Sequence, residues 1–202
     1  MTEAEDRTDP RIERSRRVVR QAALAELAEV GYGRFTIESV SARCGVARST
    51  IYRHWPDKLT LIADALQTLN RQPGPADAAG ETSPRQRVRQ LVRHLAEAFR
   101  DSIVADCLPA IIEAAAHDRD VRDFHHQYNA SRRRALVEAI AAGIAAGDIA
   151  DDVDPALAAL ALAGPIVYRR LMTGDSFDPN QVDQLIDLVL GEPPARSPDT
   201  GC

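Results

Sequence analysis

The chain has 202 residues, enough for one small and one medium-sized domain, and 45% of them are hydrophobic. Its net charge of −5 argues at first against nucleic acid as a partner, and three widely spaced cysteines argue against a disulfide framework and favour reduced thiols. The polar, acidic start and the lack of an apolar run approaching ~18 residues predict neither a signal peptide nor a membrane span. We therefore expect a cytoplasmic protein.

The distribution of charge reverses the first impression. Eleven basic and six acidic residues lie between Arg7 and Lys58, so this stretch carries +5 and the remainder of the chain −10. A basic end on an acidic body is the asymmetry expected of a protein that binds DNA with one end. The arginines from Arg11 to Arg20 can contact phosphates beside such a site, or they can form the solvated face of a helix.

The first predicted element is a helix over residues 11–30. Val19, Ala23 and Leu27 recur at helical spacing along it, and the run Gly31-Tyr32-Gly33 ends it.

A second helix is predicted to begin at Thr36, whose hydroxyl can cap it. Ile37 and Val40 give this helix one apolar stripe, and Gly45 supplies the left-handed residue that ends it in a sharp turn. Val46 is the apolar residue of that turn, and we expect it to be buried.

The third helix is predicted from about residue 47 to residue 55, with Ile51 and Trp55 facing the core. Its outer face suits DNA, because arginine can bond to the edge of guanine, and Ser or Thr can bond to bases or phosphates. In a helix-turn-helix the start of the second helix meets base edges, and Lys58, just past a Pro-Asp break, can grip a phosphate. The predicted DNA contacts are Thr36, Arg48, Ser49, Thr50, Tyr52, Arg53, His54 and Lys58. The alternative is an ordinary helical hairpin with a solvated polar face.

The rest of the chain is also predicted to be helical, without any strand pattern. A loop is predicted over residues 72–83 from its Pro, Gly and Ser content, and a helix break is predicted near Pro109. Asp154 can cap a helix with Pro155 at its first position. We expect helices over residues 57–70, 84–101, 103–117, 120–146, 155–172 and 179–190.

These elements predict an all-α fold, with a three-helix DNA-binding domain and a larger helical domain. We place the DNA-binding helix-turn-helix domain at residues 1–58, with a flexible arm at 1–10. The larger domain spans residues 59–191, and a Pro-rich, disordered tail follows at 192–202.

The N-terminal pattern resembles the signature of the TetR family of transcriptional regulators. It is carried by Gly31-Tyr32, Thr36, Gly45-Val46, Thr50-Ile51-Tyr52, His54-Trp55 and Asp57-Lys58. The chain departs from that signature at Cys44, where the family usually has Ala, and at Ala47, where Ser is frequent and caps the helix better. Residues 147–191 also resemble the C-terminal domain of one large TetR subgroup, through Gly164 to Arg170, Thr173-Gly174-Asp175 and Phe177-Asp178-Pro179.

The resemblance implies a regulator that binds a palindromic double-stranded DNA operator as a homodimer. Repression is the usual mode of the family, with release by a small-molecule effector, here expected to be hydrophobic. The last two helices are apolar enough to form the dimer joint as a four-helix bundle, although the same stripe can be intramolecular core. The predicted interface residues are Leu157, Leu160, Ala161, Gly164, Leu171, Val182, Leu185, Ile186 and Val189.

The middle helices are then expected to hold the effector. The predicted lining residues are Phe99, Leu108, Ile112, Phe124, Tyr128 and Tyr168, although residues of these types are more often plain core than ligand contacts.

Other functional classes find less support in the sequence. No phosphate-binding loop, G-x-S-x-G or CxxC motif occurs, so we expect no catalytic residue and no cofactor. His117, His125 and His126 invite a metal site, but a turn is predicted to separate them and no HExxH motif is present, so no metal is expected. Cys107 can be a redox sensor or a small buried hydrophobe. A helical adaptor that binds proteins through the basic end is the remaining alternative.

Overall fold

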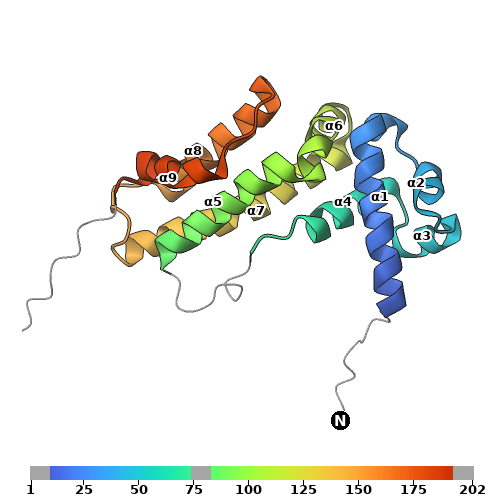
Figure 1. Ribbon diagram of the computed structural model, residues 1–202, viewed down its shortest axis with the longest axis horizontal. Helices are drawn as coiled ribbons and strands as arrows, with labels where there is room; N and C mark the ends of the chain where they lie inside the picture. The colour runs from blue at the N-terminus through green and yellow to red at the C-terminus, as the bar shows by residue number, and fades with distance from the viewer. Residues whose placement is uncertain (1–9, 74–82, 193–202) are drawn as a thin grey trace, which may run out of the picture. The chain divides into compact units, whose positions relative to one another are not determined.

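The computed structural model describes residues 10–73 and 83–192, and all regular elements in those ranges are helical, which confirms the predicted fold class. Most of the predicted arm, loop and tail lies outside the described residues. The helices form two compact units (Figure 1). The first unit holds the described residues up to Arg71 together with Asp106–His125, and the second holds Gln72–Ala105 and the chain from His126 onward.

The first unit is built on α1 (Pro10–Arg34), which packs against α2 (Ile37–Cys44) and α4 (Lys58–Leu69). The helix α3 (Arg48–His54) packs against α2, and Figure 1 draws both on the same side of α1. Most of α6 (Ile103–His117) and the start of α7 (Arg119–Ala145) complete the unit. Its fully buried side chains include Val19, Leu24, Leu27, Phe35, Val40, Ile51, Leu61, Ile62 and Leu66.

The end of α1 agrees with the glycine signal in the sequence. Gly31 has a φ of 73°, a conformation that glycine adopts without steric cost, so the regular helix stops there and one short turn continues to Arg34. This change of direction brings Phe35 into the core, where it is 1% exposed.

The predicted break at Pro109 was wrong, because α6 is continuous from Ile103 to His117. A proline inside a helix removes one hydrogen bond and costs roughly 3 kcal/mol. Cys107, Leu108 and Ile111 are all buried around it, and burial of that apolar surface outweighs the local cost.

The second unit contains α5 (Pro84–Asp101), most of α7, α8 (Pro155–Tyr168) and α9 (Val182–Leu190). Ser83 and Gln86 form a capping box at the start of α5. Asp154 caps α8 by accepting the Leu157 N–H at 2.7 Å, as the sequence predicted. The buried side chains of this unit include Val88, Val92, Ile140, Leu162, Ile166, Val182 and Ile186.

Two features of the α8 region differ from the sequence expectation. The helix does not end at about residue 172 as a plain α-helix but turns into a π-helical segment, Arg169–Thr173, which stops at Gly174. The combined stretch Pro155–Thr173 has 19 residues and is long and apolar enough to cross a membrane by length and composition alone. The prediction that no such run exists was therefore wrong.

The compact units divide the chain differently from the predicted domains, because part of α6 and the start of α7 belong with α1–α4. The functional division at residues 58 and 59 stays a prediction.

Candidate DNA-binding site

The turn between α2 and α3 is fixed by local hydrogen bonds. At the start of α2 the Ser39 N–H donates to Thr36 Oγ1 at 3.1 Å, and the Thr36 N–H donates to Ser39 Oγ at 3.3 Å. At its end Gly45 takes the left-handed conformation, with φ 71°, and the Ser41 hydroxyl donates to the Val46 carbonyl at 2.7 Å. This turn sets the direction in which α3 leaves. Val46 itself is half-buried, less than the sequence predicted.

The helix α3 presents a polar face above two buried anchors. Ile51 is 0% exposed and Trp55, which follows the last helical residue, is 4% exposed, as predicted. Ala47 at the N-cap makes no side-chain hydrogen bond, which agrees with the weak cap expected there. Among the predicted contacts on α3, the exposed side chains are Arg48, Ser49, Tyr52 and Arg53, and the half-buried ones are Thr50 and His54.

Lys58 is already engaged within the unit. Its Nζ donates to the Tyr32 carbonyl oxygen at 3.0 Å and lies 4.0 Å from the centroid of the Tyr32 ring. Burial, with Asp118 and Asp57 nearby, raises the pKa of Tyr32 to about 12, so the ring stays neutral under this cation. The Asp57 carboxylate accepts the Thr60 N–H at 2.8 Å, so this N–H at the start of α4 already has a partner.

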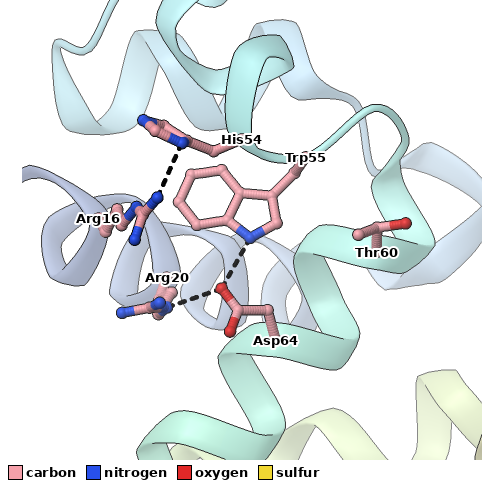
Figure 2. Close-up of a pocket in the computed structure, with 6 residues that line it drawn as sticks. All are labelled: Arg16, Arg20, His54, Trp55, Thr60 and Asp64. Carbon is pink, nitrogen blue, oxygen red and sulfur yellow. Dashed lines mark hydrogen bonds and ion pairs between the residues drawn. The ribbon is translucent and has the colours of Figure 1, made fainter. Parts of the chain in front are cut away.

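A carboxylate on α4 holds the end of α3 in place. Asp64 accepts the Trp55 indole N–H at 2.7 Å and the Arg20 Nε–H at 2.8 Å (Figure 2). Thr68 donates to its other oxygen at 3.1 Å. Burial alone opposes ionisation of Asp64, but the bonds from Arg20 and Trp55 outweigh it and lower the pKa of this carboxyl. The network joins α1, α3 and α4 at one point.

This network was not predicted from the sequence. Arg20 was grouped with the arginines that can contact phosphates, yet it is 8% exposed and also bonds to Glu13 at 2.7 Å. The available signal was Trp55, since a buried indole N–H usually needs an acceptor. Asp64, nine residues after Trp55 and on the next helix, is the acceptor that this signal could have indicated.

Arg43 joins α2 to α1 in the same way. Its guanidinium pairs with Glu26 at 2.8 Å and with Glu29 on α1. Together the two networks connect α1 with α2, with α4 and with the end of α3, and so support the outer face of α3.

An open cleft of about 280 Å³ lies beside the end of α3. Figure 2 shows Arg16 from α1 reaching toward His54, with the indole of Trp55 below and Asp64 on the far side of the indole. Its lining residues are Arg16, Arg20, His54, Trp55, Thr60 and Asp64.

Two family models match the chain, one over the helix-turn-helix and one over most of the residues that follow it. Residues 19–65, which hold the turn and α3, match the model described as bacterial regulatory proteins, tetR family. Residues 78–189 match the tetracyclin repressor-like C-terminal domain. The chain belongs to the TetR family of transcriptional regulators. It is a DNA-binding transcriptional regulator, as the outer face of α3 predicted.

Curated TetR-family relatives match along nearly the whole chain. An uncharacterized HTH-type transcriptional regulator of Mycobacterium bovis is 32% identical over 211 residues, covering 99% of this chain and 95% of the relative. The DNA-binding transcriptional repressor TetR of Mycobacteroides abscessus is 28% identical over 180 residues, covering 86% and 92%.

Solved structures share the fold. A TetR-family transcriptional regulator from Rhodococcus sp. matches with a TM-score of 0.70 and 21% identity, covering 88% of this chain and 98% of that chain. The regulator FadR from Bacillus subtilis, in complex with stearoyl-CoA, matches with a TM-score of 0.70 and 18% identity, covering 86% and 97%. At these identities the likeness concerns the TetR fold alone.

The predicted dimer residues divide into two groups. On α8, Leu157, Leu160, Ala161 and Gly164 are exposed, and Leu171 is half-buried in the π-helical segment. On α9, Val182, Leu185 and Ile186 are buried within the chain, where α9 packs on α5 and α8, and Val189 is half-buried. The buried group is therefore core in this TetR-family chain, and Leu188, which was not among the predicted residues, is 82% exposed.

The predicted effector-lining residues are also split. Phe99, Leu108 and Tyr128 are buried and Phe124 is half-buried, whereas Ile112 and Tyr168 are 43% and 61% exposed. Tyr168 lines an open cleft of about 590 Å³ at the end of α8. Its other lining residues are Pro165, Arg169, Thr173, Asp175 and Ser176.

Among the residues that the structure describes, no group of three or more His, Cys, Asp or Glu side chains is placed to hold a metal ion. Cys107 is 0% exposed and its thiol donates to the Leu24 carbonyl at 3.3 Å. Burial, with Asp106 nearby, raises its pKa to about 12, which makes the thiol a poor nucleophile. These properties support the small buried hydrophobe over the redox sensor.

Proposed function

We propose that this TetR-family regulator is a repressor, that it binds a palindromic operator as a homodimer, and that a small apolar ligand releases it. The observation that carries the proposal is the polar outer face of α3, exposed on a unit in which Asp64 and Arg43 fix the helices around it. An ordinary helical hairpin needs no such support for a solvated face.

Base recognition is assigned to the start of α3. Arg48 has a side chain that is 63% exposed, and its nearest carboxylate oxygen, on Glu38, is 3.5 Å away. So long and exposed a pair contributes little, which leaves the guanidinium available for a guanine edge. Ser49 and Thr50 follow it, and Tyr52, Arg53, His54, Thr36 and Lys58 are proposed as phosphate or flanking contacts.

The homodimer is assigned to the apolar face of α8. Leu157 and Leu160 on α8 are 67% and 52% exposed, and Met172 in the π-helical segment that follows is 70% exposed, which leaves apolar surface that association would bury. Small residues at Ala161 and Gly164 permit close approach of a second helix. The same burial explains why a helix of this apolar character need not be a membrane span, and we place the protein in the cytoplasm without a membrane partner.

The effector is assigned to the helices that follow α4, which carry the predicted lining residues. The Bacillus subtilis FadR structure holds stearoyl-CoA, and a transcriptional regulator from Saccharomonospora viridis, which matches with a TM-score of 0.67 and 18% identity, holds choline. These structures support the idea that the fold accommodates a ligand, and the apolar character of the predicted lining residues favours a hydrophobic one here. No catalytic residue or cofactor enters the proposal.

The proposal is tested by capturing genomic DNA fragments on the purified protein and sequencing them. A reproducible palindrome supports the operator assignment. Placed upstream of a reporter gene, the recovered fragment should lower transcription when the protein is expressed, and an apolar compound that raises the protein's thermal stability should restore it. Recovery of random fragments would favour the helical adaptor, and activation of the reporter would contradict the repressor role.

A further inference from the structure

Two basic side chains meet at the mouth of the cleft beside α3 (Figure 2). Arg16 Nη2 lies 3.1 Å from His54 Nδ1. A guanidinium can only donate, so the Nδ1 atom of His54 must accept, and the imidazole carries its single proton on Nε2. In this arrangement His54 is neutral and Arg16 is its hydrogen-bond donor.

The groups around the His54 ring leave it in a positive field. Arg16 and Arg20 face it from α1, Arg53 is its neighbour on α3, and Asp64 is the carboxylate that lines the same cleft from α4. Burial first, and then the charges of these three arginines, lowers the pKa of His54 below its usual 6.5.

The nearby carboxylates already have hydrogen-bond or ion-pair partners within the protein. Asp64 accepts bonds from Arg20, Trp55 and Thr68. Glu13 bonds to Arg20 at 2.7 Å and lies 4.0 Å from Arg16. An anion that enters the cleft mouth would therefore meet two donors, the guanidinium of Arg16 and the imidazole of His54, with the neighbouring carboxylates already neutralised.

We infer that Arg16 and His54 together form a seat for one DNA phosphate and that the seat takes up a proton when the phosphate enters. The inference rests on the proposed function, because the phosphate is identified by its place: the seat lies at the end of the helix assigned to base reading, where the DNA backbone flanks the reading helix. The proton comes from solvent and adds to Nδ1 of His54. The imidazolium and the guanidinium then both donate to phosphate oxygens.

The sign of the pH dependence follows from this geometry. A bound phosphate favours the charged imidazole, so the pKa of His54 is higher in the complex than in the free protein. Affinity for DNA therefore rises as pH falls between the two values. Each pKa unit of difference corresponds to about tenfold in affinity per subunit.

The first experiment measures DNA affinity by fluorescence anisotropy, from about pH 5.5 to 8, where histidine titrates, at constant ionic strength. It uses a fragment recovered from the genomic capture. Wild-type protein should lose affinity as pH rises, His54→Gln should show a flat profile, and His117→Gln, which changes an exposed histidine on α6, should behave as wild type. A flat wild-type profile, or an unchanged slope in His54→Gln, overturns the inference.

Two further measurements separate the parts of the claim. Calorimetric titration of wild-type protein in two buffers of different ionisation enthalpy counts protons directly, needs no variant, and should find net proton uptake on DNA binding near pH 6.5. Zero uptake contradicts the proton link. Arg16→Gln should reduce the slope of log affinity against log salt by about 0.9 for each phosphate that the variant no longer neutralises, and an unchanged slope contradicts the seat. Folded protein that binds no DNA at any pH would instead refute the proposed function.

Discussion

Arg48 is the residue on which sequence recognition depends most. It stands in the first turn of α3 with a largely exposed guanidinium. Arg48→Ala should weaken binding to the operator by about 1–3 kcal/mol and relax the preference at one base pair. Anisotropy titrations with the operator and with scrambled DNA measure both effects. Arg119→Ala, which removes an arginine that is 85% exposed on α7, is the control and should leave both affinities unchanged.

Asp64 is expected to stabilise the packing of α1, α3 and α4 rather than to contact DNA. Asp64→Asn removes the negative charge that pairs with Arg20 and should lower the free energy of unfolding by about 1–3 kcal/mol. Denaturant unfolding followed by the fluorescence of Trp55, the one tryptophan of the chain, measures this. Asp152→Asn, at an exposed position after α7, should have no such effect.

The contribution of Asp64 also carries a pH signature. Because its pKa in the folded protein lies below the ordinary 3.8, the stabilisation is complete well above that value and is lost as pH falls through the folded value. The difference between wild type and Asp64→Asn should therefore shrink in acid. A difference that stays constant down to strongly acidic pH would mean that the carboxylate charge is not what stabilises the unit.

The two described cysteines should react differently. Cys44 is half-buried at the end of α2, whereas Cys107 is fully buried with a raised pKa. Brief treatment of native protein with a thiol reagent, followed by peptide mapping, should label Cys44 and spare Cys107 until the protein is unfolded. Rapid labelling of Cys107 in native protein would reopen the redox-sensor interpretation.

For the helices, the sequence predicted those ends that depend on residues within one turn. The cap at Asp154, the proline that follows it and the glycine at position 45 each act within one turn of their helix, and the structure has them as expected. The predicted break at Pro109 was wrong because α6 packs against α1, which is far away in sequence, and the burial of α6 residues there keeps the helix continuous. No local pattern contains that information.

In the DNA-binding site, too, local features were predictable and contacts between distant residues were not. The outer face of α3 was predictable from helical spacing alone, since residues that flank Ile51 and Trp55 must face outward. The contacts of Arg16 with His54 and of Arg20 with Asp64 span 38 and 44 residues of sequence. They depend on how α1, α3 and α4 pack, so the arginine run looked uniform in the sequence although its members have different roles.

The exposed face of α8 is where the dimer is expected to form. Leu160→Glu puts a charge on that face and should convert the dimer to monomer, because an unpaired charge is costly to bury. Sedimentation velocity measures the change. Gln127→Glu, which adds the same charge at an exposed position on α7, should remain dimeric. A wild-type protein that sediments as a monomer would refute this interface.

For the whole molecule, the acidic net charge conceals a basic segment that holds the helix-turn-helix. The stretch from Arg7 to Lys58 carries a net charge of +5, which favours attraction to DNA, while the remainder of the chain carries −10. In the proposed dimer, two copies of this short reading helix would contact DNA, and the length of DNA between the two half-sites would be set by the symmetry of the dimer.

The central claim, that paired α3 helices read DNA, is tested most directly by hydroxyl-radical footprinting on a recovered fragment. We expect two symmetric protected segments whose centres lie about 10 base pairs, or a multiple of one helical turn, apart. Both should disappear together in Arg48→Ala at a protein concentration that saturates the wild-type site. A single protected segment, or a footprint that Arg48→Ala leaves unchanged, would contradict the claim.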